Sequence, residues 1–160
     1  METVTASYAG FWKRFVAYLI DGILLGIVEL VIFIPVLGML GLGIAGAGSN
    51  GEDMEHAAGM LLAFIFGPLL FAILAIAVAG WLYFALMESS VKGATLGKMA
   101  LGIRVTDLNG GRISFARASG RYFGKLVSGA ILYIGFIMAG FTQQKQALHD
   151  IMAGCLVVNK

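Results

Sequence analysis

A carboxylate lies inside the first long apolar segment of the chain. Asp21 follows Trp12 by nine residues, so in a membrane-spanning helix it would lie about 13 Å into a hydrocarbon core about 30 Å thick. An ionised carboxylate there costs about 2.5–3.5 kcal/mol on insertion scales, so it must contact protein, water or a cation. Arg14, seven residues earlier, shares the helix face but lies about 10 Å away along the axis. We therefore expect a third group, water or an ion between them.

A second acid extends this charged set. Glu29 lies eight residues beyond Asp21 and nearer the far end of the apolar segment. Two interpretations stay open: polar contacts that hold helices together, or a proton or cation path through Asp21 and Glu29. Gly22 and Gly26 form a G-x-x-x-G pair beside Asp21, and this spacing predicts the close approach of another helix.

The amino-acid composition indicates that most of the chain is surrounded by lipid. Of 160 residues, 59% are hydrophobic and 12% are charged, and the mean hydropathy is +0.91. Soluble domains carry about 25% charged residues, so this chain is predicted to be an integral membrane protein. The formal charge of +2 gives no reason to expect nucleic acid binding, and the single cysteine, Cys155, excludes an intramolecular disulfide framework.

Catalysis is not expected from this sequence. The length allows one domain without a separate soluble catalytic module, and no nucleophile with a base and an orienting group emerges. The adjacent His149 and Asp150 could belong to a metal or catalytic pair, but a lone histidine beside one acid is more often structural. We expect no enzyme, no cofactor and no metal site.

The predicted fold is an all-α polytopic membrane protein, with about three transmembrane or re-entrant helices and a short cytoplasmic β-hairpin. A single domain over 1–160 would contain helices at about 12–38 and 57–87, a loop with the hairpin at 88–116, a helix at about 117–141 and a C-terminal segment at 142–160.

Two details of this fold depend on local sequence. The turn dipeptide Asn109-Gly110 between Gly102–Thr106 and Arg112–Phe115 predicts the hairpin. The apolar part of the third helix, Leu126–Phe141, has 16 residues, so it either spans thinly or bends back. Residues 155–158 read as a further strand, which could pair only on the hairpin's side of the membrane.

The charge distribution predicts the orientation. Residues 49–56 contain three acids and no Lys or Arg, whereas the second apolar segment is followed by many cations. Positive residues stay on the cytoplasmic side, so the N-terminus is predicted to be inside and residues 49–56 outside. We also expect anionic lipid head groups to bind six of these cations: Lys92, Lys98, Arg104, Arg117, Arg121 and Lys125. Topology determination alone is the alternative, and both can hold.

Arg14, Asp21 and Asp150, the last within Leu148-His149-Asp150, together resemble the RDD family, which is named for these three residues. The motifs Gly93–Lys98, Leu101–Val105 and Gln144–Val158 occur in the same order, so the resemblance covers about residues 9–159. It implies a multi-pass protein of the bacterial inner membrane. Some family members have been associated with sodium/proton antiport, which would make Asp21 the carrier carboxylate, with Arg14 and Asp150 tuning it.

Two functions follow as hypotheses. The first is an accessory or structural subunit that packs with other membrane helices in a larger or homo-oligomeric assembly; the small size and the helix-packing glycines favour it. The alternative is an ion-coupled transporter of the sodium/proton antiport type, although no internal repeat is visible. The expected partners are the lipid bilayer, anionic lipids, and other membrane subunits or further copies of this chain.

Overall fold

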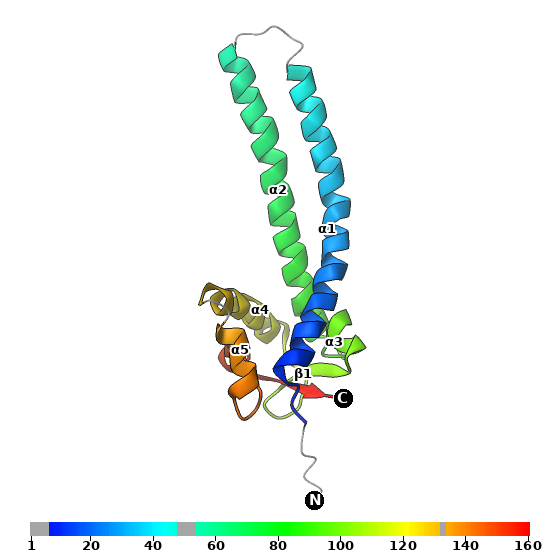
Figure 1. The fold of residues 1–160 in the computed structure, drawn as a ribbon, viewed down its shortest axis with the longest axis vertical. Coiled ribbons are helices and arrows are strands. Elements are labelled where there is room, and N and C mark those ends of the chain that lie inside the picture. The colour runs from blue at the N-terminus through cyan, green and yellow to red at the C-terminus, as the bar shows by residue number, and fades with distance from the viewer. Residues whose placement is uncertain (1–6, 48–53, 132–133) are drawn as a thin grey trace, which may run out of the picture. The chain divides into compact units, whose positions relative to one another are not determined.

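The fold is mostly helical (Figure 1). The computed structural model describes residues 7–47, 54–131 and 134–160, so most of the acidic segment expected outside the membrane lies beyond the described residues. The chain divides into two compact units, one formed by residues 1–23 and 81–160 and the other by residues 24–80.

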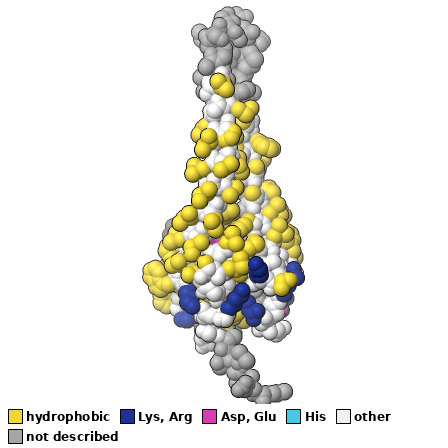
Figure 2. Space-filling model, turned by 90° about the vertical axis from the view of Figure 1, so that its right-hand side faces the viewer, with side chains coloured by type: hydrophobic (Ala, Val, Ile, Leu, Met, Phe, Trp, Pro, Cys, Tyr) yellow, Lys and Arg dark blue, Asp and Glu magenta, His cyan; other side chains and the backbone are white. Residues whose placement is uncertain are grey.

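Two long helices supply the membrane spans. Helix α1 (Phe11–Ala47) contains an apolar stretch of 29 residues, and α2 (Met54–Glu88) contains one of 23 residues. Both exceed the about 20 residues that cross a bilayer core. Most of the described large apolar side chains of residues 24–80 are exposed (Figure 2), among them Ile27, Val31, Ile34, Leu70 and Phe71. This surface is suited to lipid, and the predicted class of helical membrane protein is confirmed.

The shorter elements belong to the unit of residues 1–23 and 81–160. In chain order they are α3 (Leu96–Ala100), β1 (Ile103–Asp107), α4 (Phe115–Ala130), α5 (Ile134–Phe141), α6 (Leu148–Ala153) and β2 (Cys155–Asn159).

A sharp bend separates α4 from α5. The two axes are inclined by 103°, so the segment expected as one helix over 117–141 consists of two. Ser114 caps the N-terminus of α4, and its side-chain oxygen accepts a hydrogen bond from the backbone N–H of Arg117. Its core-facing positions are occupied by small or charged residues, and its other faces are exposed. Together α4 and α5 form either a broken span or a re-entrant segment.

The small antiparallel sheet is confirmed, but its pairing differs from the expected hairpin. Strand β1 pairs with β2, with Val105 opposite Val157 and Asp107 opposite Cys155. Residues 112–114 form no strand. The turn after β1 does form, with Asp107 Oδ1 accepting from the N–H groups of Asn109 and Gly111. Only three residues then separate Gly111 from the first residue of α4, which leaves no length for a second hairpin strand.

The chain just before α1 lies along the other edge of β2. Tyr8 forms an antiparallel bridge with Val158, and the N–H of Ala9 donates to the carbonyl of Val157 at 2.9 Å. Ile103, Val105, Val157 and Ala9 are all buried in one apolar core. The start of α1 and the last strand therefore share one side of any membrane that the spans cross.

Candidate functional site

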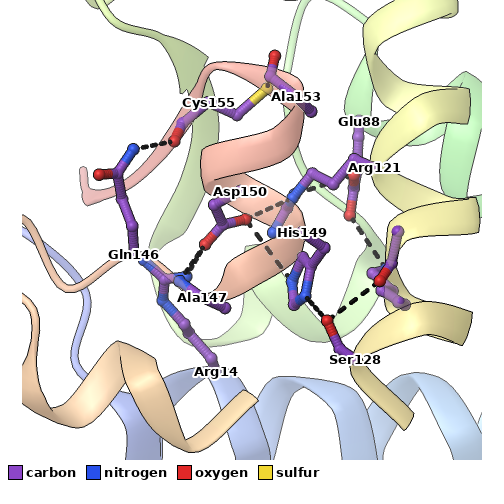
Figure 3. A network of polar contacts seen from close by, with 12 residues as sticks. Arg14, Glu88, Arg121, Ser128, Gln146, Ala147, His149, Asp150, Ala153 and Cys155 are labelled. Carbon is purple, nitrogen blue, oxygen red and sulfur yellow. Dashed lines mark hydrogen bonds and ion pairs between the residues drawn. The ribbon is translucent and has the colours of Figure 1, made fainter. Parts of the chain in front are cut away.

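Asp150 is the centre of a buried ionic network (Figure 3). It lies in the first turn of α6, and its carboxylate accepts from the N–H of Ala147 at 3.0 Å. Its side chain is 0% exposed. Arg14 of α1 contacts Oδ2, and the Nε of Arg121 on α4 lies 2.7 Å from Oδ1. Asp150 therefore joins α1, α4 and α6 through charge-assisted bonds.

Glu88, at the end of α2, is the second carboxylate of the network. Arg121 donates its Nη1 to Glu88 Oε2 at 2.9 Å, so one guanidinium bridges Glu88 and Asp150. Lys98 of α3 forms an ion pair with Oε1, and Lys125 Nζ lies 3.8 Å from the same oxygen. The side chain of Glu88 is 1% exposed. Three cations from two elements thus converge on one buried carboxylate.

The network shifts the pKa values of those of its residues that lie outside the membrane spans. Burial alone would raise the pKa of Asp150, but Arg121 and Arg14 outweigh it and hold that pKa well below its usual range. Burial and the nearby Arg121 lower the pKa of Lys98, although Glu88 opposes the shift. Burial also lowers the pKa of His149 to about 3 despite the nearby Asp150. At neutral pH Asp150 is therefore ionised and His149 is uncharged.

Asp21 has a separate set of partners. Its carboxylate accepts from Tyr83 Oη at 2.7 Å, from Thr95 Oγ1 at 2.6 Å and from the backbone N–H of Gly97 at 2.7 Å. The residue is 1% exposed. No hydrogen bond or ion pair joins it to Arg14 within the described part of the chain. Of the three residues that carry the family resemblance, the structure brings Arg14 and Asp150 together and gives Asp21 its own contacts with α2, Thr95 and α3.

The other residues expected in the first span lie in open surroundings. A Cβ built on Gly22 or Gly26 would meet no atom within 4 Å, so no described helix of this chain packs closely against them. Glu29 is half-buried and forms no ion pair with a described residue. The role of these two glycines in packing against another helix stays a prediction.

The six cations expected to bind lipid head groups divide into two sets. Lys92, Arg104 and Arg117 are exposed. Lys98 and Arg121 are buried, and the side chain of Lys125 is 14% exposed, because all three point toward Glu88. The charge pattern could not separate these sets, since it does not show which cations meet a buried acid.

Ser128, His149 and Asp150 lie close together in the order of a hydrolase triad. His149 Nδ1 lies 3.4 Å from Ser128 Oγ, and Nε2 lies 3.6 Å from Asp150 Oδ1. The serine hydroxyl, however, donates to the carbonyl of Gly124 in its own helix at 3.0 Å. Ser128 is 0% exposed, and a Cβ on Gly135 would lie 2.7 Å from its oxygen. This contact packs α5 and α6 against α4 and leaves no room for a substrate at the hydroxyl.

A cavity of about 340 Å³ adjoins the ionic network. Its polar lining includes Arg14, Asp21, Lys98, Arg121 and Lys125, and its apolar lining includes Phe11, Phe15, Phe84, Phe136 and Ile137. All lining residues belong to the unit of residues 1–23 and 81–160.

Sequence reasoning did not single out Glu88, Tyr83 or Thr95. Glu88 offered a signal, because it is an acid that ends an apolar segment just before a basic one. Thr95 lies within the Gly93–Lys98 motif, but only the fold shows that it contacts Asp21.

The structure is that of a small helical membrane protein. It has two long apolar helices, a set of short elements held together by buried ion pairs, and a two-stranded sheet. The chain belongs to the RDD family, whose sequence model matches residues 8–154. It is 38% identical over 153 residues to the uncharacterized protein YxaI of Bacillus subtilis (strain 168), covering 95% of this chain and 97% of that protein. It is 30% identical over 165 residues to the uncharacterized membrane protein YteJ of the same organism, covering 99% and 85%. No solved structure matches the chain.

Proposed function

We propose that this protein is an accessory or structural subunit of the bacterial cytoplasmic membrane, which packs with other membrane helices in a larger or homo-oligomeric assembly. The observation that carries this proposal is that the buried carboxylate of Asp21 accepts three short hydrogen bonds, from Tyr83 on α2, from Gly97 on α3 and from Thr95 just before α3. A carrier carboxylate must exchange its partners in every cycle, and three charge-assisted bonds oppose that exchange. Asp21 is thus suited to joining helices.

The ionic network supports the same proposal. Arg121 connects Asp150 of α6 with Glu88 of α2, and removing one member of such a buried pair costs about 3–5 kcal/mol. Groups that are this strongly coupled favour one arrangement of the surrounding helices. A rigid base of this kind suits a subunit that other proteins pack against.

We also propose that the protein is no enzyme. His149 is a weak base because burial lowers its pKa to about 3, and the hydroxyl of Ser128 is directed to the carbonyl of Gly124. A general base works best with a pKa near the operating pH. These groups are therefore poorly suited to acyl transfer.

The proposed contact face for partner helices includes Gly22 and Gly26. Their surroundings are open within the described chain, and small residues at this spacing allow helix backbones to approach closely. The exposed apolar side chains of residues 24–80 would contact partner helices or lipid. The excess of Lys and Arg after α2 supports a cytoplasmic location for the N-terminus.

Ion-coupled transport of the sodium/proton antiport type is the second candidate. One observation favours it: Asp21 lines the cavity next to the ionic network, so a cation could approach its carboxylate. Glu29, without an ion-pair partner among the described residues, would extend that path.

Asp21→Asn separates the two candidates. Asparagine keeps the shape and can still accept from Tyr83 and Gly97, while the hydroxyl of Thr95 can turn to accept from the new amide. We expect proteoliposomes with the parent protein to show no sodium-dependent proton flux above protein-free liposomes, as measured with an internal pH dye. The variant should form the same native assembly as the parent on blue native gels. A sodium-dependent flux in the parent that Asp21→Asn abolishes would overturn the subunit proposal in favour of transport.

A further inference from the structure

Two residues that line the cavity, Arg14 and Lys125, each have a hydrogen-bond donor without an acceptor among the described residues. Arg14 Nη2 is buried without a hydrogen-bond partner, although Nη1 and Nε of the same guanidinium are both used. Lys125 Nζ lies 4.0 Å from the centroid of the Phe84 ring and 3.8 Å from Glu88, and it donates no hydrogen bond to a described residue. Unsatisfied buried donors are costly, so an acceptor entering the cavity would be favoured.

The cavity also carries an excess of positive charge. Its lining and the adjoining network bring four cations, Arg14, Lys98, Arg121 and Lys125, to three carboxylates, Asp21, Glu88 and Asp150. The oxygens of Asp21 are already taken by three donors of its own. A ligand that complements this site is therefore an anion with several acceptor oxygens.

The apolar lining indicates that the rest of the ligand is apolar. Phe11 and Phe15 lie in the first turns of the span that α1 provides, and Phe136 and Ile137 lie on α5. Phe15 is 42% and Ile137 46% exposed, so apolar surface continues from the cavity to the outside of this unit. A volume of about 340 Å³ falls at the lower end of the about 300–1,000 Å³ of ligand sites, which suits a head group and the first part of its chains.

We propose that this cavity binds one anionic phospholipid, with the phosphate accepting from Arg14 and Lys125 and the start of an acyl chain lying along Phe11, Phe15 and Phe136. This site is distinct from the exposed cations Lys92, Arg104 and Arg117, which do not line the cavity. It goes beyond the proposed subunit function, since it would exist whether or not the protein has partners.

Lys125→Met tests the proposal because methionine keeps the unbranched apolar stem and removes the ammonium. Arg117→Gln is the matched control: it removes one positive charge from the exposed side of the same helix. The probe is palmitoyl-oleoyl-phosphatidylglycerol titrated into the detergent-purified protein, with bound lipid counted by native mass spectrometry. We expect one saturable phosphatidylglycerol per chain, about tenfold weaker binding in Lys125→Met, and unchanged binding in Arg117→Gln.

Two further variants separate loss of the lipid contact from misfolding. Lys125→Arg retains the charge and should retain binding, which separates loss of the ammonium from misfolding. Arg14→Lys keeps a charge beside Asp150 but lacks the second guanidinium nitrogen, so it should also weaken binding. Equal saturable binding of phosphatidylcholine, an equal loss in Arg117→Gln, or full competition by inorganic phosphate at the same concentration as the lipid would overturn the proposal.

Discussion

Arg121 uses two parts of one guanidinium for two carboxylates, and this geometry explains how so many charges are buried in so small a unit. Its Nε bonds to Asp150 at 2.7 Å and its Nη1 to Glu88 at 2.9 Å. A lysine offers one point charge and could not hold both acids in this way. Arg121 is therefore the residue on which the relative positions of α2, α4 and α6 depend most directly.

The uncharged state of His149 makes the stability of the fold depend on pH. Its folded pKa is lowered to about 3, while an unfolded chain takes up the proton near pH 6.5. The unfolded state then binds more protons over this range, so stability falls as the pH decreases from about 6.5 toward 3. At pH 5 the expected loss from His149 is about 2 kcal/mol relative to pH 7.5.

His149→Gln should remove that part of the pH dependence. We expect the thermal unfolding midpoint in detergent to fall less between pH 7.5 and pH 5 for the variant than for the parent. Asp150 does not interfere in this window, because its lowered folded pKa makes its contribution disappear only below its ordinary value of 3.8. Parallel curves for the two proteins would show that His149 is protonated in the folded state.

At the scale of elements, the contact of α3 with α1 requires a glycine. The N–H of Gly97 donates to Asp21 at 2.7 Å, and a Cβ at this position would overlap the carbonyl oxygen of Ala17 and lie 3.0 Å from Asp21 Cγ. Backbone atoms of a helix cannot move away as the end of a flexible side chain can. Only a residue without a side chain lets α3 approach α1 closely enough for this hydrogen bond.

Gly97→Ala is therefore expected to destabilise the protein by about 1–3 kcal/mol, the usual effect of overpacking. Gly22→Ala is the matched control, since a Cβ there meets nothing within 4 Å and alanine favours helix by about 1 kcal/mol. Thermal unfolding in detergent should place Gly97→Ala below the parent and Gly22→Ala at or above it. Equal midpoints for both variants would contradict the close approach of α3 and α1.

The elements that depend on local sequence were predictable. The apolar lengths of α1 and α2 and the turn at Asn109-Gly110 follow from composition and dipeptide chemistry, and the structure contains them. The partner of β1 did not follow, because β2 begins 48 residues after β1 ends and no local rule selects it. Arg112 and Ser114 read as strand residues, yet Arg112 donates to the carbonyl of Ser89 and Ser114 caps α4.

The candidate site was only partly predictable for the same reason. The cost of charge in an apolar segment identified Asp21 and Arg14 as residues that need partners. Which partners they have depends on tertiary contacts: Thr95 is 74 residues from Asp21, and Asp150 is 136 residues from Arg14. The burial of Lys98 and Arg121 likewise depends on Glu88, which only the fold brings near both.

At the scale of the whole molecule, the sheet restricts how the chain can cross a membrane. Strand β2 pairs with β1 and also bridges Tyr8, so the chain before α1, the chain after α2 and the C-terminal strand lie together. Two spans return the chain to its starting side, and β2 can then pair only if α4 and α5 enter and leave on that side. The bend of 103° between these helices agrees with a re-entrant segment.

Cysteine labelling tests this topology. In a Cys155→Ala background, cysteines at Asn109 and at Lys160 should both be protected from an impermeant thiol reagent applied outside intact cells. A cysteine at Ser49 should react. The sheet places Asn109 and Lys160 on the same side of the membrane. The excess of Lys and Arg predicts that this side is the cytoplasmic one. Labelling of only one of Asn109 and Lys160 would contradict the sheet in the membrane, and labelling of both would reverse the orientation.

The long separation of Arg14 from Asp150 has a consequence for biosynthesis. The ribosome makes Arg14 first, and 135 residues must follow before Asp150 exists to neutralise it. The first helix therefore enters the translocon before the residue that neutralises Arg14 has been made. Strand β1 also waits for its partner, because β2 begins 48 residues after β1 ends. A chain whose synthesis stops before Leu148 lacks α6 and β2. Such a chain leaves Arg14 and Arg121 without Asp150 and leaves the edge of β1 unpaired. Those exposed features give membrane proteases a physical means to distinguish an incomplete copy from a finished one.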